Sequence, residues 1–582
     1  MRKLVCNPMN LEYRYQIKDS MLGNGVFREA ADPTMLLFHE MYFLFASMSG
    51  GFWYSNDLYD WKFKETPELP IYDYAPDVRE VNGEVVFCAS RRGENCTLYR
   101  SSDPLTVPFS AVSAPFAFWD PDVFQDDDGR VYFYWGCSNK EPIYGIELDT
   151  GTLMPVGEKK SLIAEKEAEH GWERKGENNR LAPAVTERDK AIRKAVGSKP
   201  FIEGAFMTKH DGKYYLQYAA PGTECNVYSD GVYVGEGPLG PFQYQTHNPF
   251  SSVPGGYLQG AGHGSTFCDK AGNWWHVSTM RISVNENFER RIGLFPCDFD
   301  ADGLLYCNQN FACYPMVLPE GRRTDMDRTS PCMMLLSYGK TATASSSRQG
   351  CEPGKGVNEN ARSWWAAEPD DRAPWYQVDL GKVCRVEAVQ VNFADHKLPM
   401  PAYNKDEMHK EQAWSSRMIW VQPQRTAYLL EGSENGSRWQ ILKDTRSANT
   451  DYSHDFITLP DPLRLRYIRV SEISVPMEGV AAISGLRVFG SGGGALPAPV
   501  KEVRANRTED GRNILLRWDS AEGADGYNVR YGIAPEKQYS SWQLFGKTEL
   551  DLSLINKGQS YCITVDSFNE NGVSIGKTIS VR

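Results

Sequence analysis

Long hydrophobic runs are missing from this sequence. No window approaches the roughly eighteen consecutive apolar residues of a membrane-spanning helix. The N-terminal segment MRKLVCNPMNLEYRYQ also lacks the apolar core of an export signal. The sequence therefore predicts no membrane partner.

Clustered positive charge is missing as well. The 63 Lys and Arg residues are outnumbered by 75 Asp and Glu residues, which gives a formal net charge of −12. Phosphate binding requires a basic patch or stripe. We therefore expect no nucleic-acid partner and a neutral substrate.

Paired cysteine motifs are the third absence. The thirteen cysteines are odd in number, include no CxxC pair and mostly stand in apolar, strand-like segments such as Val86-Phe87-Cys88. This pattern predicts free, buried thiols in a reducing compartment. We therefore expect a cytoplasmic protein, or a secreted one if a signal segment has been removed.

Aromatic residues and turn formers are abundant: 30 Tyr, 26 Phe, 15 Trp, 51 Gly and 34 Pro. This mixture favours many short strands joined by turns. A chain of 582 residues also exceeds what one hydrophobic core usually serves. The composition thus predicts an all-β protein of several domains.

A pattern recurs five times in the first part of the chain. Each copy begins with an acidic residue or a histidine, followed by an apolar stretch, a turn and a strand rich in aromatics. The clearest copies begin at Asp120, Glu203 and His263, and each has a glycine nine positions later. Looser copies begin at Asp32 and Asp77. Repetition of this kind predicts a five-bladed β-propeller over residues 1–325.

The innermost strand of each propeller blade lines the central channel, so the residue that opens each repeat should face a shared axis. A buried polar group without a partner costs a few kcal/mol. Repeated acids at this position therefore indicate water, a metal ion or a substrate in the channel. A polar insertion from about Leu162 to Pro200 separates the third and fourth repeats, and its segment Trp172-Glu173-Arg174 is a candidate for the active-site rim.

From Asp32 to Tyr314 the chain resembles glycoside hydrolase family 43, whose members are five-bladed propellers. The resemblance is carried by WDPDVFQDDDGRVYFYWG, FIEGAFMTKHDGKYYLQYA, YSDGVYVGEGPLGPF and GHGSTF. It implies that Asp32, in an Asp-Pro context, is the general base. It also implies that Asp120 tunes the pKa of the acid and that Glu203, in Glu-Gly-Ala, is the general acid.

These roles agree with the chemistry of glycoside hydrolysis with inversion. One carboxylate activates a water molecule, and a carboxylic acid about 6.5–9.5 Å away protonates the leaving oxygen. Asp32 should therefore stay ionised, whereas Glu203 should have a raised pKa, helped by the charge of Asp120. Asp122 faces the same side of its strand as Asp120 and is the residue most easily mistaken for it.

Further residues are candidates for the substrate pocket. Sugar rings pack on aromatic faces, which makes Trp53, Trp119 and Phe206 candidates for the pocket wall, with the blade core as the alternative. Asp77 is expected to shape the pocket or to make a structural bond. Arg291 resembles an arginine of the family that contacts substrate, although the adjacent Arg290 leaves the register open.

His263, in Gly262-His263-Gly264, resembles a histidine of the family that lies near a calcium ion or a water cluster on the propeller axis. The resemblance therefore leaves open a structural calcium ion with His263 as the metal-associated residue. Calcium normally prefers oxygen ligands, so a single histidine is weak support for a metal. No other cofactor is expected.

Two smaller β-sandwiches are expected after the propeller. Residues 337–490 resemble the coagulation factor 5/8 type C, or discoidin, domain through WWAAEPDDRAPWYQVDLGKVCRVEAVQV and LRYIRVSE, with an irregular insertion near residues 399–424. This is also the fold of family 32 carbohydrate-binding modules. A Gly- and Pro-rich joint, SGGGALPAP, then leads to residues 498–582. These resemble a fibronectin type III domain, with Trp518 in its core and Tyr561 at the place of a tyrosine corner.

The expected function is an inverting, exo-acting glycoside hydrolase that removes a terminal pentose, α-L-arabinofuranose or β-xylose, from plant-derived oligosaccharides. A β-galactosidase or β-L-arabinofuranosidase of the same fold is the near alternative. Another is a propeller hydrolase of family 32, 62 or 68, although the nucleophilic motif of a sucrose hydrolase is not seen. A non-catalytic carbohydrate-binding protein is the alternative from a different class. The sequence does not indicate the oligomeric state.

Overall fold

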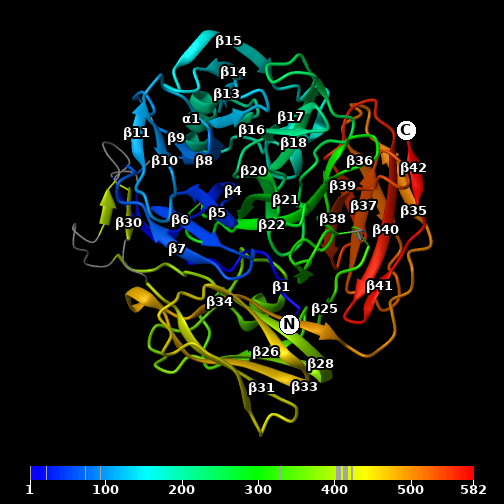
Figure 1. Ribbon diagram of the computed structural model, residues 1–582. Helices are drawn as coiled ribbons and strands as arrows, with labels where there is room; N and C mark the ends of the chain where they lie inside the picture. The colour runs from blue at the N-terminus through cyan, green and yellow to red at the C-terminus, as the bar shows by residue number, and fades with distance from the viewer. Residues whose placement is uncertain are drawn as a thin grey trace.

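In the computed structural model the chain consists almost entirely of β-strands (Figure 1), which confirms the predicted all-β class. The structure describes all residues except 1, 21–22, 72–73, 92, 287, 324–325, 327–328, 401–407, 411–416 and 421–423. The expected end of the propeller at residue 325 and much of the insertion at 399–424 lie outside the described residues. The one α-helix described, α1 (Glu187–Val196), and short 3-10 turns at Gly171–Glu173, Glu177–Asn179, Pro353–Val357 and Pro476–Glu478 complete the secondary structure.

Five antiparallel four-stranded sheets form the blades of the predicted propeller, each in sequential strand order. Blade 1 contains β4 (Ala31–Phe38), β5 (Met41–Ser47), β6 (Gly51–Ser55) and β7 (Lys62–Glu65). Blade 2 contains β8 (Tyr74–Val81), β9 (Glu84–Ser90), β10 (Leu98–Ser101) and β11 (Ser110–Ser113). Blade 3 contains β12 (Asp122–Gln125), β13 (Val131–Trp135), β14 (Ile143–Leu148) and β15 (Pro155–Ile163). Blade 4 contains β16 (Glu203–His210), β17 (Lys213–Ala220), β18 (Ser229–Gly235) and β19 (Phe242–Tyr244), and blade 5 contains β20 (Gln259–Cys268), β21 (Trp274–Arg281), β22 (Arg290–Phe299) and β23 (Leu305–Cys307).

The innermost strands close into a ring around the axis. Each of β4, β8, β12, β16 and β20 packs against the next, and β20 packs against β4. The short pair β1 (Leu4–Val5) and β24 (Met316–Val317) joins the two ends of the propeller chain. The second strands, such as the sequence MYFLFAS of β5, are buried on nearly every residue because neighbouring blades cover both of their faces. The aromatic-rich segments therefore form the core between blades.

The inner strands are bent at the residues that open the repeats. The ladders of β4, β8, β16 and β20 shift register beside Asp32, Asp77, Glu203 and His263. Three of the repeat-opening residues have left-handed backbone angles, with φ of 50° at Asp32, 49° at Asp120 and 49° at His263. Such conformations are uncommon outside glycine and concentrate at functional sites. The bends turn these side chains toward the end of the channel.

The residues from Met334 to Ser491, here called the second domain, form one eight-stranded sheet with the path β25-β34-β28-β33-β31-β32. Its strands are β25 (Met334–Leu335), β26 (Thr341–Ala344), β27 (Trp365–Ala366), β28 (Tyr376–Phe393), β31 (Ala427–Ser433), β32 (Gln440–Asp444), β33 (His454–Ser474) and β34 (Ala482–Ser491). Their apolar residues form a single core. Figure 1 shows this domain below the propeller, in green and yellow.

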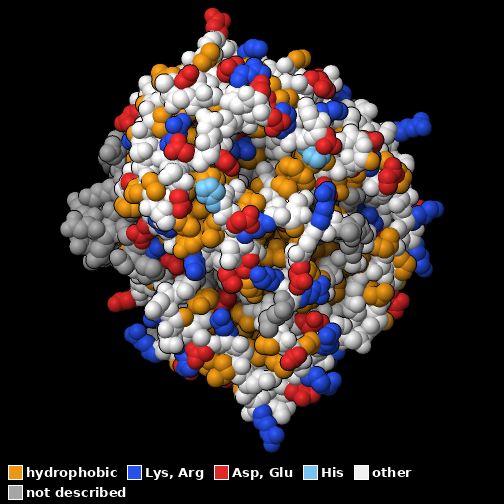
Figure 2. Space-filling model, viewed as in Figure 1, with side chains coloured by type: hydrophobic (Ala, Val, Ile, Leu, Met, Phe, Trp, Pro, Cys, Tyr) orange, Lys and Arg blue, Asp and Glu red, His pale blue; other side chains and the backbone are white. Residues whose placement is uncertain are grey.

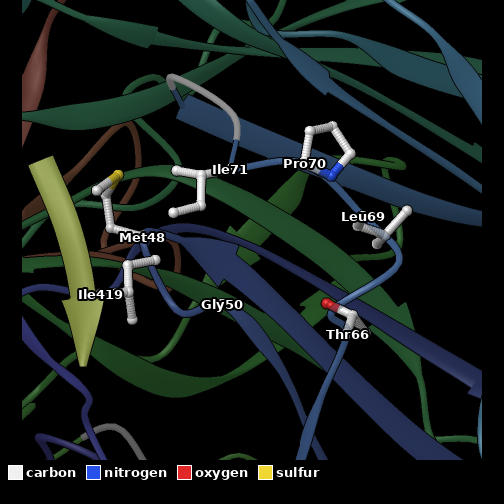
Figure 3. Close-up of a pocket in the computed structure, with 7 residues that line it drawn as sticks. All are labelled: Met48, Gly50, Thr66, Leu69, Pro70, Ile71 and Ile419. Carbon is white, nitrogen blue, oxygen red and sulfur yellow. The ribbon is translucent and has the colours of Figure 1, made fainter. Parts of the chain in front are cut away.

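A composite sheet joins the second domain to the propeller. Strand β30 (Arg417–Trp420) pairs with β29 (Met408–Lys410) on one side and with β2 (Tyr15–Ser20) on the other, and β2 pairs with β3 (Gly23–Arg28). Ile419 of β30 lies in a small apolar pocket with Met48, Gly50, Thr66, Leu69, Pro70 and Ile71 of the propeller (Figure 3). The volume of this pocket, about 10 Å³, is at the lower limit for one water molecule. It is therefore a packing seam.

The residues from Val503 to Val581, here called the third domain, form two facing sheets. One has the order β35-β36-β39, and the other has β38-β37-β40-β41 with β42 also paired to β40. The strands are β35 (Val503–Arg507), β36 (Ile514–Trp518), β37 (Gly526–Gly532), β38 (Ser540–Phe545), β39 (Glu549–Leu552), β40 (Tyr561–Asn569), β41 (Gly572–Ser574) and β42 (Ile579–Val581). Trp518 is in the core, and the Tyr561 hydroxyl accepts a 2.8 Å hydrogen bond from the Asn556 amide, as in a tyrosine corner. The fibronectin type III assignment itself stays a prediction.

All thirteen cysteines are free, and most are buried, as predicted. Within the described ranges, no helix has the length and apolar character needed to cross a bilayer. Figure 2 shows Lys and Arg side chains interspersed with Asp and Glu on the face that it displays.

Candidate active site

A cavity of about 150 Å³ opens at one end of the propeller channel. Pockets for drug-sized ligands span roughly 300–1,000 Å³, so this one suits a single small ring. It is lined by Asp32, Tyr74, Trp119, Asp120, Cys137, Glu203, Thr223, His263, Phe288 and Arg290. The structure thus brings together the three predicted carboxylates, the predicted histidine and one of the three predicted aromatics.

Asp32 is held in the ionised state by its neighbours. Its carboxylate accepts a hydrogen bond from the Ser47 hydroxyl at 2.7 Å and from the Thr279 hydroxyl at 3.5 Å. The guanidinium of Arg290 lies 3.3 Å away and the ring of His263 lies 3.4 Å away. Burial would raise the pKa of Asp32, but Arg290 and His263 lower it below its usual value. This carboxylate can therefore accept a proton near neutral pH.

Glu203 has the opposite environment. Burial raises its pKa, and the negative charge of Asp32 adds to this shift. Tyr228 donates a 2.6 Å hydrogen bond to one carboxyl oxygen, and the thiol of Cys137 lies 3.1 Å from the other. A carboxyl group with a raised pKa holds its proton at neutral pH and can donate it to a leaving group.

Asp120 and His263 lie next to this pair. Burial and the charges of Glu203 and Asp32 raise the pKa of Asp120 to about 7, against a lowering effect of His263. The imidazole of His263 lies 3.7 Å from Asp120. Burial opposes protonation of His263, but the negative charges of Asp32, Asp120 and Glu203 raise the pKa of its ring above the usual value.

Gly204 is required by the approach of this ring. A Cβ atom at Gly204 would lie 2.7 Å from Cδ2 of His263, and the residue has a φ of 63°. Both the space and the backbone angle exclude larger residues there. This explains the glycine of the Glu-Gly-Ala motif.

Asp77 and Asp122 lie outside the cavity wall, in the closed part of the channel. Arg79 contacts Asp122 at 2.6 Å and lies 3.7 Å from Asp77. Asp77 also accepts a bond from the Val123 amide, and Asp122 one from the Met207 amide. Asp77 therefore does not line this cavity, and its carboxylate makes a structural bond between neighbouring blades, which was one of the two expectations for it.

Two of the predicted aromatic wall residues are also in the core. Trp53 is 1% exposed and packs in blade 1 with Tyr13 and Phe63. Phe206 is 3% exposed and stacks on the guanidinium of Arg79 at 3.7 Å. Neither ring lines the cavity: Trp53 packs in the core of blade 1, and Phe206 lies against Arg79. Trp119 is half-buried and does line the cavity.

Arg290, and not Arg291, reaches the cavity. Arg291 is 2% exposed and turns away from it, toward His454 of the second domain at 2.9 Å. Successive side chains of a strand point to opposite faces. An error of one residue in the register therefore assigns the wrong one of the two arginines to the cavity. Of the two arginines between which the sequence left the register open, Arg290 is the one that lines the cavity.

The inserted segment Trp172-Glu173-Arg174 does not form the cavity rim that was expected. Trp172 is fully buried, and Arg174 donates hydrogen bonds to the Arg512 carbonyl and the Asn513 side chain of the third domain. The amide of Gly171 donates to the Ile555 carbonyl. The insertion therefore attaches the third domain to blade 4.

The residues at the cavity do not fit a calcium ion. In the described part of the chain, one set of His, Cys, Asp and Glu ligand atoms lies within 4.8 Å of one another, and it consists of Asp120, Cys137 and Glu203. Calcium takes six to eight oxygen ligands, whereas this set includes a thiol. The set does not include His263. The calcium ion and the metal role of His263 thus gain no support here.

Five of the cavity residues were not among the candidates expected from the sequence: Tyr74, Cys137, Thr223, Phe288 and Arg290. Tyr228, the hydrogen-bond partner of Glu203, was not among them either, although it begins the motif YSDGVYVGEGPLGPF of the resemblance. A signal existed for Arg290, since it was the open alternative to Arg291. Tyr74 begins β8, and Cys137, Thr223, Tyr228 and Phe288 come from segments between strands, which the repeat pattern does not align.

Comparison with known proteins supports this description. Residues 24–305 match the family model of glycosyl hydrolases family 43. Residues 355–470 match the model of the NedA-like, galactose-binding domain of the factor 5/8 type C kind, which confirms the predicted discoidin-like domain.

Two curated relatives match part of the chain. A protein named beta-xylosidase from Xylanibacter ruminicola is 33% identical over 135 residues, which is 22% of this chain and 39% of that protein. A xylosidase/arabinosidase from Bacteroides ovatus is 28% identical over 136 residues, which is 22% of this chain and 39% of that protein. The chain thus spans about two fifths of the length of these relatives.

Among solved structures, a thermostable family-43 glycoside hydrolase is 24% identical and has a TM-score of 0.41, with 55% of this chain and 100% of that chain covered. The match over residues 24–305 shows that the propeller of this chain is similar to glycosyl hydrolases family 43.

Proposed function

We propose that this protein is an inverting, exo-acting glycoside hydrolase that removes a terminal pentose, α-L-arabinofuranose or β-xylose, from plant-derived oligosaccharides. The observation that carries the proposal is the pair of opposite environments in one cavity. The pKa of Asp32 is lowered and that of Glu203 is raised. Two carboxyl groups whose pKa values are pushed apart are the arrangement of a general base and a general acid.

In the proposed reaction, Asp32 accepts a proton from a water molecule while the oxygen of that water molecule attacks the anomeric carbon. Glu203 donates its proton to the glycosidic oxygen as the carbon–oxygen bond breaks. The sugar leaves with a new hydroxyl group and inverted configuration, and proton exchange with solvent restores both carboxyl groups. Arg290 and His263 keep Asp32 ionised, and Asp120 adds negative charge beside Glu203.

The size of the cavity supports exo action. Its volume of about 150 Å³ accommodates one terminal ring better than several consecutive sugars. Trp119, Tyr74 and Phe288 supply aromatic surface around that ring. The names of the two relatives, a beta-xylosidase and a xylosidase/arabinosidase, support a pentose.

A panel of 4-nitrophenyl glycosides tests the substrate. We expect turnover of the β-D-xyloside or the α-L-arabinofuranoside, whereas turnover of only the β-D-galactoside or the β-L-arabinofuranoside would identify one of the near alternatives. Proton NMR of the first-formed anomer tests the stereochemistry, and retained configuration would contradict the proposed base. Binding of sugars without turnover would indicate a carbohydrate-binding protein.

A further inference from the structure

Two pairs of consecutive residues connect the cavity to the second domain. One pair is Arg28-Glu29 at the end of β3, and the other is Arg290-Arg291 at the start of β22. The inner members, Glu29 and Arg290, contact each other at 2.5 Å, and Arg290 contacts Asp32. The outer members, Arg28 and Arg291, contact the second domain.

Arg28 is completely buried, and its charge is balanced by the second domain. Its Nε and Nη2 donate to the two carboxylate oxygens of Asp395 at 2.8 and 2.9 Å. Its Nη1 contacts Asp451. Tyr15 of β2 also donates to Asp395, at 2.8 Å. A bidentate, buried guanidinium has a fixed geometry, so the second domain sets the position of the residue next to Glu29.

Arg291 makes the parallel connection. Its Nε donates to Nε2 of His454 at 2.9 Å, and its Nη1 donates to the backbone carbonyls of Arg28 and Arg290. Burial and the positive charges of Arg291 and Arg28 lower the pKa of His454 well below its usual value. The ring of His454 is therefore neutral and can accept this bond. The other ring nitrogen lies 3.0 Å from the Asn392 side chain.

The composite sheet adds a third connection. Gln16 of β2 pairs with Ile419 of β30, and its side chain donates to the carbonyl oxygens of Met48 and Glu29. Met48 follows Ser47, which donates to Asp32. Figure 3 shows Ile419 against Met48 and Ile71, close to this point. Three separate contacts thus lead from the second domain to the same carboxylate.

We infer that the second domain positions the general base Asp32, through Arg28-Glu29 and Arg290-Arg291, so that the catalytic centre is complete only when both domains are present. This inference rests on the proposed function of Asp32. Arg28, Arg291, Asp395 and His454 are positioning residues, since they act through Glu29 and Arg290. The discoidin-like domain therefore supports the active site from outside the cavity.

The first test is Asp395→Asn in the full chain, since this change keeps the side-chain size and leaves Asp451 as a partner for Arg28. The matched control is Glu359→Gln. Glu359 forms an equally buried, bidentate pair with Arg487 at 2.9 Å, and Arg487 donates to the Cys313 carbonyl of the propeller. Both variants weaken a buried pair at the same domain interface, but only Asp395 belongs to the contacts that lead to Asp32.

For Asp395→Asn we expect kcat to fall about tenfold, because a displacement of about 1 Å in a catalytic group costs up to about 10²-fold. We also expect the acidic limb of the pH–kcat/KM profile to move to higher pH, since Arg290 then stabilises the Asp32 carboxylate less. Glu359→Gln should lower the melting temperature without moving that limb. Equal loss of stability in both variants, with the limb unchanged in both, would overturn the inference.

His454→Leu provides a second variant if Asp395→Asn does not fold. It removes the acceptor of Arg291 without adding a charge, and the acidic limb should move in the same direction. Crystal structures of these variants provide a readout that does not depend on turnover. Arg290 should move away from Asp32 in Asp395→Asn and stay at 3.3 Å in Glu359→Gln, even if the proposed hydrolysis fails. An unchanged Arg290 in all variants would contradict the inference by itself.

Discussion

The propeller channel contains two groups of buried acids that differ in access and in charge balance. Asp32, Asp120 and Glu203 face a cavity, whereas Asp77 and Asp122 lie in the closed part of the channel around Arg79. In the cavity, the pKa of Asp32 is lowered while that of Asp120 is raised to about 7. In the closed group, burial raises both pKa values, to about 6 for Asp77 and about 8 for Asp122, against a lowering effect of Arg79.

The two groups of acids differ in their access to the cavity and not in their sequence pattern. Asp32 and Asp77 both open a repeat, and Asp120 lies two residues before Asp122, the first residue of β12. The difference lies in access: Asp77 and Asp122 accept bonds from backbone amides of neighbouring blades and do not line the cavity. Asp120 also accepts a bond from a backbone amide, that of Gly204, but it lines the cavity with Asp32 and Glu203. Arg290 and His263 lower the pKa of Asp32, whereas burial raises the pKa values of Asp120 and Glu203.

The largest effect is expected for Asp32→Ala. Loss of the general base should reduce kcat by about 10⁴-fold, at the upper end of the usual contribution of acid–base catalysis. Steady-state kinetics on the best aryl glycoside measures this effect, and circular dichroism checks the fold. Asp77→Asn is the matched control, with kcat expected within about twofold of the wild type. Equal losses in both variants would remove the distinction between the two groups.

A smaller effect is expected for Asp120→Asn. This change removes a negative charge next to Glu203, so the pKa of Glu203 should fall and the general acid should lose its proton at lower pH. The alkaline limb of the pH–kcat profile should therefore move to lower pH, with a loss in kcat of about 10²-fold. An unchanged alkaline limb would contradict the role assigned to Asp120.

Arg290→Met should move the other limb. Arg290 lowers the pKa of Asp32, so its removal raises that pKa and the base becomes protonated at higher pH. The acidic limb of kcat/KM should move up by about one pH unit, and each unit corresponds to about 1.4 kcal/mol. Arg79→Met is the comparison variant in the closed group, and a similar movement of the acidic limb there would show that the shift is not specific to the cavity.

The smallest effect on activity is expected for Asp122→Asn, whose readout is stability. The pKa of Asp122 in the folded protein is raised from 3.8 to about 8. Its contribution to stability is therefore fully present below about pH 4 and is lost as the pH rises through 8. The variant should show a weaker fall of unfolding free energy over this range, by at most about 1.4 kcal/mol per pH unit, at nearly unchanged kcat. Denaturant titrations at several pH values check this, and a tenfold loss of kcat would place Asp122 in the catalytic group.

Local sequence signals were sufficient to predict the propeller and to pick out the three carboxylates that line its cavity. Each repeat contains its own turn and its own aromatic strand, so the five copies could be aligned without any contact information. The repeats that begin at Asp32, Asp120 and Glu203 therefore identified side chains that do meet in one cavity. The aromatic residues of the cavity wall were harder to predict. The local sequence around Trp53 and Phe206 is the same whether their rings face the cavity or are buried elsewhere in the propeller.

Contacts between distant segments could not be predicted from the sequence. The pairing of Gln16 with Ile419 and the ion pair of Arg28 with Asp395 join segments that no local pattern relates. The insertion at Trp172 was expected at the cavity and instead holds the third domain, since its polar sequence is compatible with either surface. The exchange of Arg290 for Arg291 has a similar origin, because the register of β22 is set by its neighbours.

The most direct test of the account is the leaving-group dependence of Glu203→Gln. A 2,4-dinitrophenyl glycoside releases a stable phenolate that needs no proton, whereas an oligosaccharide needs a general acid. Glu203→Gln should therefore keep most of its activity on the dinitrophenyl glycoside and lose about 10²–10⁴-fold on the oligosaccharide, while Asp32→Ala loses activity on both. Equal losses of Glu203→Gln on the two substrates would contradict the assignment of Glu203 as the general acid.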